Sequence, residues 1–498
     1  MKVLNSRCGV IFVTRTTLWL CLCLFTSFYL DAQQVTRKNI DDLSPTELGA
    51  YEHAIQLIRD RSASNPYLLD GYAWQAWVHN VNRVSVPVNN ELKQGDQDPT
   101  SFYQIAAAQQ YADGTYGYPG MCEHGKDIFF VWHRAQFYYF EKILQNTDPE
   151  GTIVDSRGNK YATKNIGIPY WNFTRAPSGN KFPKVFENQS SVLYHEPRNN
   201  QINPRDTTFT SPHLLANIVR EANWNVFGGY PNATEGGYGR FEAEVHNPMH
   251  VPYVGGSMAN PATAAYDPIF YSFHAYVDYI FEAWIEEHGT EGMTSLRYFL
   301  RAQQPTEFNL PDYDPGAGDR PNMGRAELYL DIQKLGYNYS DNPADRILDQ
   351  NQTNEYLTGS GDKTLVFGKS KISPYYKMYT GGVSWRPEAQ GTVTNQPITV
   401  RAANRDNPFV FVYEEKDPSS SYRIDLYIHG QKVKANIASE KFQKKYFVKS
   451  GVAWLSSDHS SHARKSHKFN LDLTEVVDDL NSRYPGETCT LTIVYNKL

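Results

Sequence analysis

The segment CEHGKDIFFVWHRAQFYYFEKIL, residues 122–144, decides the fold of this chain. It places Cys122 two residues before His124, and His133 follows nine residues after that histidine. From about residue 127 to 145 the sequence is aromatic or apolar on most sides, which predicts a deeply buried helix. A histidine on such a helix is either a hydrogen-bonded core residue or a metal ligand.

A second pair of histidines lies in VHNPMHVPYVGG, residues 245–256. His246 and His250 are four residues apart, so they face the same way if the segment is helical. Pro248 between them is compatible only with a first helical turn. We therefore expect the edge of a helix at His246.

Two further histidines lie on predicted helices. His274 is within a helix predicted over residues 267–288, and His79 ends a buried helix predicted over 66–80. Inward side chains on facing helices are how helical bundles build metal sites. Clustered imidazoles without matching thiolates or carboxylates favour copper, zinc or iron. Two groups of three histidines predict two metal ions.

The net charge limits the classes of partner, and the sequence pattern divides the chain into domains. A net charge of −6 argues against a nucleic-acid or anionic-membrane surface. We expect a mainly α protein, with a helical-bundle metal domain over residues 33–348. Residues 349–362 are polar and contain glycine, which predicts a linker. Alternating short runs in residues 363–498 predict a C-terminal β-sandwich domain.

The N-terminus predicts export. Basic residues precede the apolar run TLWLCLCLFTSFYL and Ala32 follows, as in a secretory signal peptide over residues 1–32. Asp31 leaves an uncleaved anchor as the alternative. No later segment is apolar for long enough to span a bilayer, so we expect no membrane span in the mature chain. Five N-x-S/T sequons suit a secreted glycoprotein: they begin at Asn172, Asn188, Asn232, Asn338 and Asn351.

Only Cys122 and Cys489 follow the predicted signal peptide. A secreted domain stabilised mainly by disulfides would contain more cysteines. Two alternatives stay open at this point. The two residues form one disulfide, or Cys122 has another chemistry and Cys489 is a buried thiol.

These segments resemble the coupled dinuclear copper family of tyrosinases, catechol oxidases and molluscan-type hemocyanins. Residues 122–144 resemble its first copper motif and residues 245–284 its second. GIPYWNFT (167–174) and LGYNYSD (335–341) resemble two further family segments. The resemblance covers about residues 35–345 and implies two copper ions. By this resemblance Cu A takes His79, His124 and His133, and Cu B takes His246, His250 and His274.

The first Cu A ligand has a rival. The family pattern is an aromatic residue, alanine, two residues and then histidine, and YAWQAWVH ending at His79 fits it. FYQIAAAQ fits almost as well, but it ends at Gln109. We favour His79, although this choice requires a 44-residue insertion before His124. Gln109 would instead imply a copper-deficient structural homologue.

The resemblance also bears on single residues around the ligands. Many family members join a cysteine to a histidine two residues later by a thioether, and Cys122 and His124 have that spacing. The family usually has histidine where this chain has Phe273 and arginine where it has Tyr279. Neither replaced residue is a ligand, so we expect copper binding with altered packing around it.

The resemblance implies a secreted oxidoreductase that uses O2 to oxidise phenols and o-diphenols to o-quinones, with monooxygenase activity on phenols. The water that deprotonates the phenol would be held by Glu242 and Asn247. Glu244 is the second choice for the acidic residue. Asn247 as a helix cap is the alternative. Phe270 would shield the second copper, or be a plain core residue. A hemocyanin-like O2-binding protein is a further alternative, although such carriers are expected as tandem repeats. The C-terminal domain would cover the site in a latent form.

Overall fold

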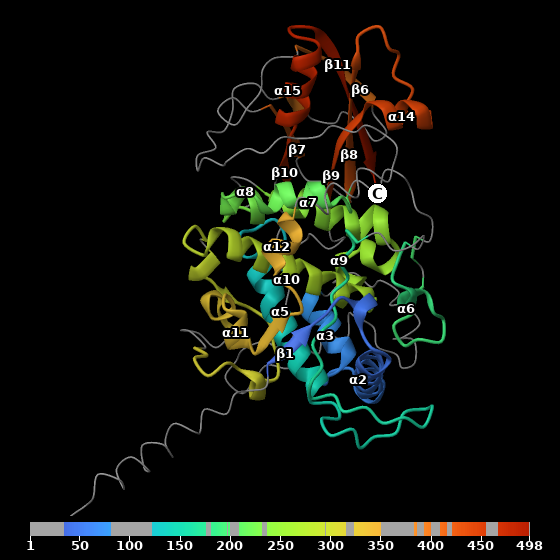
Figure 1. Cartoon of the computed structure of the whole chain (residues 1–498), viewed down its shortest axis with the longest axis vertical. Helices are drawn as coiled ribbons and strands as arrows, with labels where there is room; N and C mark the ends of the chain where they lie inside the picture. Colours follow the sequence, from blue (N-terminus) through green and yellow to red (C-terminus); the bar gives the residue numbers. More distant parts are fainter. Residues whose placement is uncertain are drawn as a thin grey trace, which may run out of the picture.

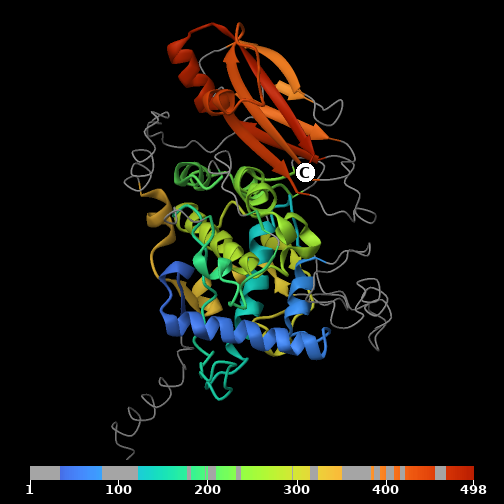
Figure 2. The ribbon, with the colours of Figure 1, turned by 90° about the vertical axis from the view of Figure 1, so that its right-hand side faces the viewer.

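The structure is a computed structural model with a helical part and a strand-rich C-terminal part (Figure 1). The two parts meet at the lower ends of the C-terminal strands (Figure 2). Its described residues are 34–80, 122–175, 181–196, 198–199, 209–231, 237–293, 295–314, 323–349, 383–385, 393–399, 409–415, 421–454 and 467–497. The predicted signal peptide, Gln109 and nearly all of the predicted linker lie outside these residues.

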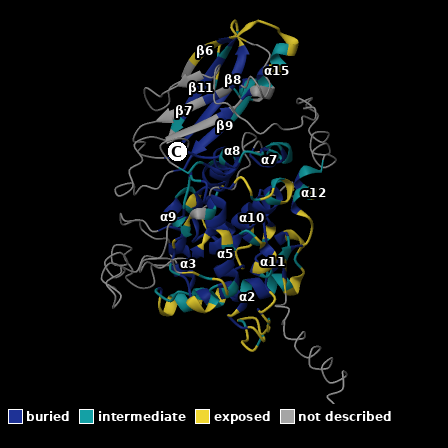
Figure 3. Cartoon of the chain, turned by 90° about the vertical axis from the view of Figure 1, so that its left-hand side faces the viewer, coloured by how far each residue is buried: buried dark blue, intermediate teal, exposed yellow. Residues whose placement is uncertain are grey.

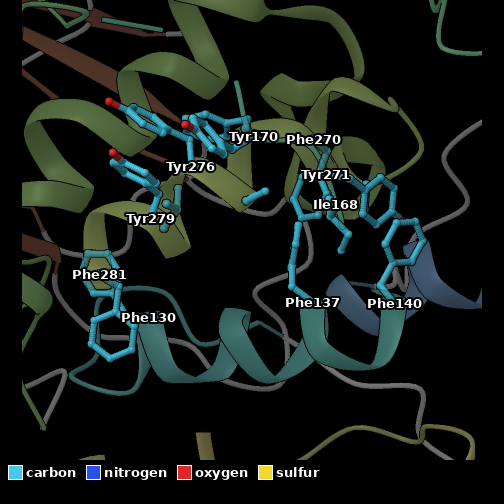
Figure 4. Close-up of a cluster of buried hydrophobic side chains, with 14 of the residues drawn as sticks. Phe130, Phe137, Phe140, Ile168, Tyr170, Phe270, Tyr271, Tyr276, Tyr279 and Phe281 are labelled. Carbon is cyan, nitrogen blue, oxygen red and sulfur yellow. The ribbon is translucent and has the colours of Figure 1, made fainter. Parts of the chain in front are cut away.

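Two buried helices form the centre of the helical part: α5 (Phe129–Gln145) and α10 (Ile269–His288). Both are buried along most of their length (Figure 3). Their facing sides interlock through aromatic rings, with Phe140 stacked on Tyr271 at 3.9 Å between ring centroids (Figure 4). Burying such large rings supplies much of the hydrophobic stabilisation. The deeply buried helix predicted over 127–145 is confirmed as α5, and the helix predicted over 267–288 is confirmed as α10; each begins two residues later than predicted.

Two further helices cover this pair. α2 (Pro45–Ser64) begins with the capping box that its sequence encodes: Ser44 accepts a hydrogen bond from the Glu47 amide, and Glu47 accepts one from the Ser44 amide. It lies across the end of the molecule opposite the C-terminal strands (Figure 2). α3 (Tyr72–His79) is completely buried and packs on α2. The predicted helix over 66–80 therefore begins later than expected.

Residues 242–254 contain two π-helical stretches, η3 (Glu242–His246) and η4 (Met249–Val254). The expected helix edge at His246 is wrong, because Asn247 and Pro248 keep helical backbone angles between the two stretches. Pro248 lies between the two stretches, as the N-cap residue of η4. π-turns occur frequently at functional sites.

A buried ionic cluster links residues from the beginning and the end of the helical part. β1 (Val35–Arg37) pairs in parallel with β4 (Tyr337–Tyr339). Arg37 binds Glu141 at 2.8 Å and Asp278 at 2.9 Å, and Arg134 also binds Asp278. Tyr337 and Tyr339 donate hydrogen bonds to the same Asp278 carboxylate. Asp278 lies one helical turn after His274 on α10, so the cluster fixes the helix that bears this histidine.

Two sheets and two helices make up the described C-terminal part. The four-stranded sheet has the order β6 (Val393–Thr399), β11 (Thr488–Lys497), β8 (Tyr422–Gly430), β9 (Phe447–Ala453), and all its pairs are antiparallel. The other has the order β10 (His467–Asp472), β7 (Val410–Glu415), β5 (Val383–Trp385). The helices α14 (Glu440–Tyr446) and α15 (Thr474–Arg483) were not predicted. The β-sandwich and the domain boundaries stay predictions.

The remaining described elements are short and mainly connect the larger ones. They are α6 (Lys184–Glu187), α7 (Pro212–Val219), α8 (Trp224–Gly228), α9 (Pro261–Ala264), α11 (Ile332–Leu335), α12 (Pro343–Leu348), β2 (Phe299–Leu300), β3 (Gly324–Arg325), η1 (Ile40–Asp42), η5 (Gly256–Ala259), η6 (Ser295–Arg297), η7 (Thr306–Phe308) and η8 (Ala326–Tyr329). Among the described residues no helix combines the length and the apolar character needed to cross a bilayer.

Candidate metal centre

The first group of metal-ligand side chains comprises His79, Cys122, His124 and His133, whose ligand atoms lie within 4.8 Å of one another. His79 is the last residue of α3, and its Nδ1 donates a hydrogen bond to the Pro261 carbonyl at 3.0 Å. His133 Nδ1 donates to the Phe129 carbonyl at 2.8 Å. Because Nδ1 carries the proton in both residues, the Nε2 atoms of His79 and His133 each have a lone pair available to bind a metal. Both Nε2 atoms are buried without a hydrogen-bond partner.

The loop before α5 supplies the third imidazole of this group. Cys122 donates its backbone amide to the His79 carbonyl at 2.7 Å, which joins the loop to the end of α3. The Cys122 Sγ lies 3.3 Å from His124 Nδ1. Burial raises the pKa of the Cys122 thiol. Cys122 and Cys489 are both free and buried, so the disulfide alternative is wrong. The thioether stays a prediction.

The second group comprises His246, His250 and His274. The Nε2 atom of His274 lies 3.3 Å from that of His246 and 3.1 Å from that of His250. His250 Nδ1 donates to the Met258 carbonyl at 3.0 Å, which leaves its Nε2 as an acceptor. Two nitrogens each 2.0–2.1 Å from one tetrahedral ion are roughly 3.3 Å apart. The observed spacing suits three ligands of a single ion.

The protonation state of all six histidines suits metal binding. Burial lowers the pKa of every one, and for His133 it lowers the pKa to about 3. Neighbouring imidazoles lower the pKa of the other five further. The imidazoles are therefore neutral at neutral pH, which is the form that coordinates a metal. Neutral imidazole is a good ligand for copper, so the residues present fit two copper ions.

The two groups face each other across the α5–α10 contact. His133 and His274 are stacked with their ring centroids 4.5 Å apart. Phe270 lies between the groups, 4.6 Å from His79 and 4.3 Å from His274 by ring centroids. It therefore contacts both groups, and its role as a shield of the second copper stays a prediction. At the position of the usual family histidine, Phe273 packs against His246 at 5.6 Å.

The two acidic residues considered for proton transfer have different surroundings. Glu242 accepts the Gly125 amide with both carboxylate oxygens, at 3.0 and 2.8 Å, and lies within 4.8 Å of His124 and His246. Glu244 instead pairs with Arg240 at 3.1 Å and with Lys449 of β9 at 3.0 Å. Of the two, Glu242 is therefore the carboxylate that lies beside the histidines, and its role in proton transfer stays a prediction.

Both ends of the Asn247 side chain are occupied. Its Oδ1 accepts from His246 Nδ1 at 2.9 Å, and its Nδ2 donates to the Val452 carbonyl of β9 at 2.9 Å. Asn247 is the C-cap residue of η3 through its backbone amide, but its side chain binds His246 and Val452 and does not cap a helix. Asn247 therefore connects a ligand of the second group to the C-terminal part.

Trp454, the residue after β9, covers the histidines. Its ring stacks on His250 with 3.8 Å between centroids and an interplanar angle of 21°, and it lies 4.8 Å from His124. Its Nε1 donates to the Ala259 carbonyl at 2.8 Å, and the residue is 2 % exposed. The sequence does not mark Trp454 as a site residue, because the run around it has the pattern of an ordinary strand and carries no local sign of this distant contact.

Comparisons with known proteins agree with this geometry. The family model described as the common central domain of tyrosinase matches residues 99–211 and 182–287. The match begins after His79 and includes Gln109, whereas the structure brings His79 to the centre. The structure of latent apple tyrosinase is similar with a TM-score of 0.57 at 15 % identity, covering 93 % of this chain and 94 % of that one. A latent aurone synthase has the same TM-score at 17 % identity, covering 93 % and 86 %.

The similar curated sequences include proteins named catechol oxidase, polyphenol oxidase and tyrosinase. Catechol oxidase B from Solanum tuberosum is 24 % identical over 81 % of this chain and 69 % of its own length. Tyrosinase HcTyr1 from a Hahella species is 25 % identical over 51 % of this chain and 54 % of its own length. The plant relatives are named chloroplastic, which points to plastid-targeted proteins and contradicts the predicted secretion. The secretory reading of the N-terminus is therefore withdrawn.

Proposed function

Because the chain belongs to the tyrosinase family of dinuclear copper enzymes, we propose that it oxidises o-diphenols to o-quinones with O2 and hydroxylates monophenols on the way to the same products. The observation that carries the proposal is the pair of facing histidine groups, which comprise six neutral imidazoles, five of them buried and that of His124 half-buried. Two o-diphenols and one O2 give two o-quinones and two waters. One monophenol and one O2 give one o-quinone and one water.

Under this proposal His79, His124 and His133 hold Cu A, and His246, His250 and His274 hold Cu B. The copper pair, when bound, supplies the binding and activation of O2. The protein supplies neutral ligands whose rings are held by the Pro261, Phe129 and Met258 carbonyls. Hydrogen bonds of this kind fix the tautomer and the orientation of a ligating imidazole.

Glu242 and Asn247 act on the substrate proton. A monophenol must lose its hydroxyl proton before it is hydroxylated, and a positioned water is a suitable acceptor. The Glu242 carboxylate is held beside His124 and His246 by the Gly125 amide, where it can orient that water. Asn247, whose Oδ1 accepts a hydrogen bond from His246 Nδ1, would help to hold the same water.

The chain as it stands is a latent form. Trp454 presents a flat aromatic ring to the face of His250, the same kind of contact that the ring of a phenol would make. A phenol cannot reach this place while Trp454 occupies it. The two solved structures of this fold named above are also of latent enzymes.

The test is copper content together with the oxidation of dopamine and tyramine, on the full chain and on Trp454→Ala. We expect two copper ions per chain in both proteins, and oxidation that rises at least about 10-fold on removal of the ring. Two copper ions and reversible O2 binding without turnover in Trp454→Ala would support an O2 carrier instead. One copper ion or none would support the copper-deficient alternative.

A further inference from the structure

We propose that the indole of Trp454 is itself a substrate of the metal centre: in the copper-loaded chain, hydrogen peroxide transfers one oxygen atom to a carbon of this ring. The inference rests on the proposed function, in which the centre transfers oxygen to the ring of a monophenol. It assigns a site of covalent self-modification within the chain, and it adds electron-rich indoles to the phenols as a class of ring that the centre oxidises.

The position of the indole carries the inference. Its ring centroid lies 3.8 Å from that of His250 and 5.6 Å from that of His246, which belong to the second group. It also lies 4.8 Å from the ring centroid of His124 and 6.1 Å from that of His79, which belong to the first group. A ring that reacts at a centre built from both groups must border both of them, and Trp454 does.

The indole is also held in one orientation. Its face stacks on His250 at an interplanar angle of 21°, and its Nε1 donates a hydrogen bond to the Ala259 carbonyl at 2.8 Å. A ring fixed at its face and at its nitrogen presents the same carbon atoms to the centre in every molecule. Oxygen should therefore enter at a single ring position, whereas an oxidant that diffuses freely attacks several.

The reaction balances with hydrogen peroxide as the co-reactant. One ring C–H and one H2O2 give one ring C–OH and one water. The ring loses two electrons, the O–O bond takes them up as it breaks, and the proton displaced from carbon is taken up by oxygen. Peroxide therefore requires no separate reductant, whereas O2 would require two further electrons. Peroxide is also much smaller than a phenol, so a covering ring that keeps phenols out does not exclude it.

Trp132 provides a demanding comparison within the same chain. Its ring centroid lies 5.0 Å from that of His133 and 6.5 Å from that of His79, so it too is a neighbour of candidate ligands. Among the described residues, however, its ring contacts with candidate ligands are limited to the first group. Trp284 is a distant comparison, because its ring packs 5.0 Å from that of Trp224, which is not a candidate ligand. Proximity to both groups thus distinguishes Trp454 from these two tryptophans.

The experiment treats the full copper-loaded chain, without a phenol, with hydrogen peroxide that carries heavy oxygen, and measures the masses of the tryptophan-containing peptides. We expect the label at one ring position of Trp454, at least about 10-fold above the label in Trp132 or Trp284, which is a modest share of the advantage of a held reactant. The copper-free chain and His274→Ala should lack this excess. His213→Ala, on α7, should match the unchanged chain. Copper content is measured on the same samples.

Equal labelling of Trp454 and Trp132 would overturn the inference, and so would label spread over several ring positions or present at Trp454 in the copper-free chain. An unlabelled Trp454 in a chain that holds two copper ions would overturn it too. If Trp454→Ala then still oxidises tyramine and dopamine, the proposed function stands and only the inference fails. If Trp454→Ala oxidises neither substrate, the proposed function itself fails, which is a different result.

Discussion

The two histidine groups are built in different ways. In the second group, His246 and His250 are four residues apart on adjoining π-turns, and only His274 comes from elsewhere. In the first group, α3, a loop and α5 each supply one histidine, and 44 residues separate His79 from His124. Local helix geometry thus forms most of the second group, whereas tertiary packing must assemble the first. Changes in packing should therefore affect the first group more.

The largest expected effect comes from removing a ligand of the second group. His274→Ala should lower the copper content from two ions to one and reduce dopamine oxidation, measured in the Trp454→Ala background, by more than about 100-fold. Changes to groups that merely support a ligand already cost 10–100-fold. His213→Ala, on α7, is the matched control. Retention of two copper ions in His274→Ala would break the assignment of this group.

The next effect tests the scaffold that the two groups share. Asp278→Asn leaves the buried Arg37 and Arg134 without a carboxylate between them, which should cost about 3–5 kcal/mol of unfolding free energy. Denaturant unfolding of the copper-free protein measures this change. Asp341→Asn, at an exposed acceptor for Tyr170 and Tyr279, should cost about 1 kcal/mol or less. Equal costs would show that the cluster does not hold α10.

The same cluster predicts a pH dependence of stability. Burial alone would raise the pKa of Asp278, but the charges of Arg134 and Arg37 outweigh it and the pKa is lowered. The charged form therefore stabilises the fold above the unfolded pKa of about 3.9, and this contribution is lost as the pH falls toward the lower folded value. Thermal unfolding from pH 6 to pH 3 should be less steeply pH-dependent in Asp278→Asn. An unchanged slope would exclude Asp278 as the cause.

A smaller expected effect distinguishes copper binding at the first group from copper binding at the second. Cys122→Ser removes the sulfur beside His124 and should weaken copper binding at the first group by about 10-fold. The second group contains no cysteine, so its affinity should not change. Competition with a chelator resolves the two sites. Cys489→Ser on β11 is the control, and equal weakening at both sites would contradict a local role for Cys122.

The second group could be predicted because its signals are local. The four-residue spacing of His246 and His250 and the continuous apolar pattern around His274 are visible in short windows of sequence. The prediction failed only at Pro248, where the sequence indicates a helix edge. The backbone instead stays helical through that proline, between the two π-helical stretches.

The sequence could not provide the contacts that depend on the tertiary fold. Nothing near Trp454 indicates that it lies on His250, and nothing near Val452 indicates that its carbonyl binds Asn247. The choice between His79 and Gln109 likewise depended on two similar eight-residue patterns. The structure places His79 beside His133, an arrangement that neither pattern contains, and Gln109 lies outside the described residues.

The most direct test of the account is the copper content of three proteins: the unchanged chain, His79→Gln and Gln109→Ala. If His79 completes the first group, the unchanged chain and Gln109→Ala should each hold two copper ions and His79→Gln only one. Two ions in His79→Gln with a loss in Gln109→Ala would contradict the assignment and move the first ligand to residue 109.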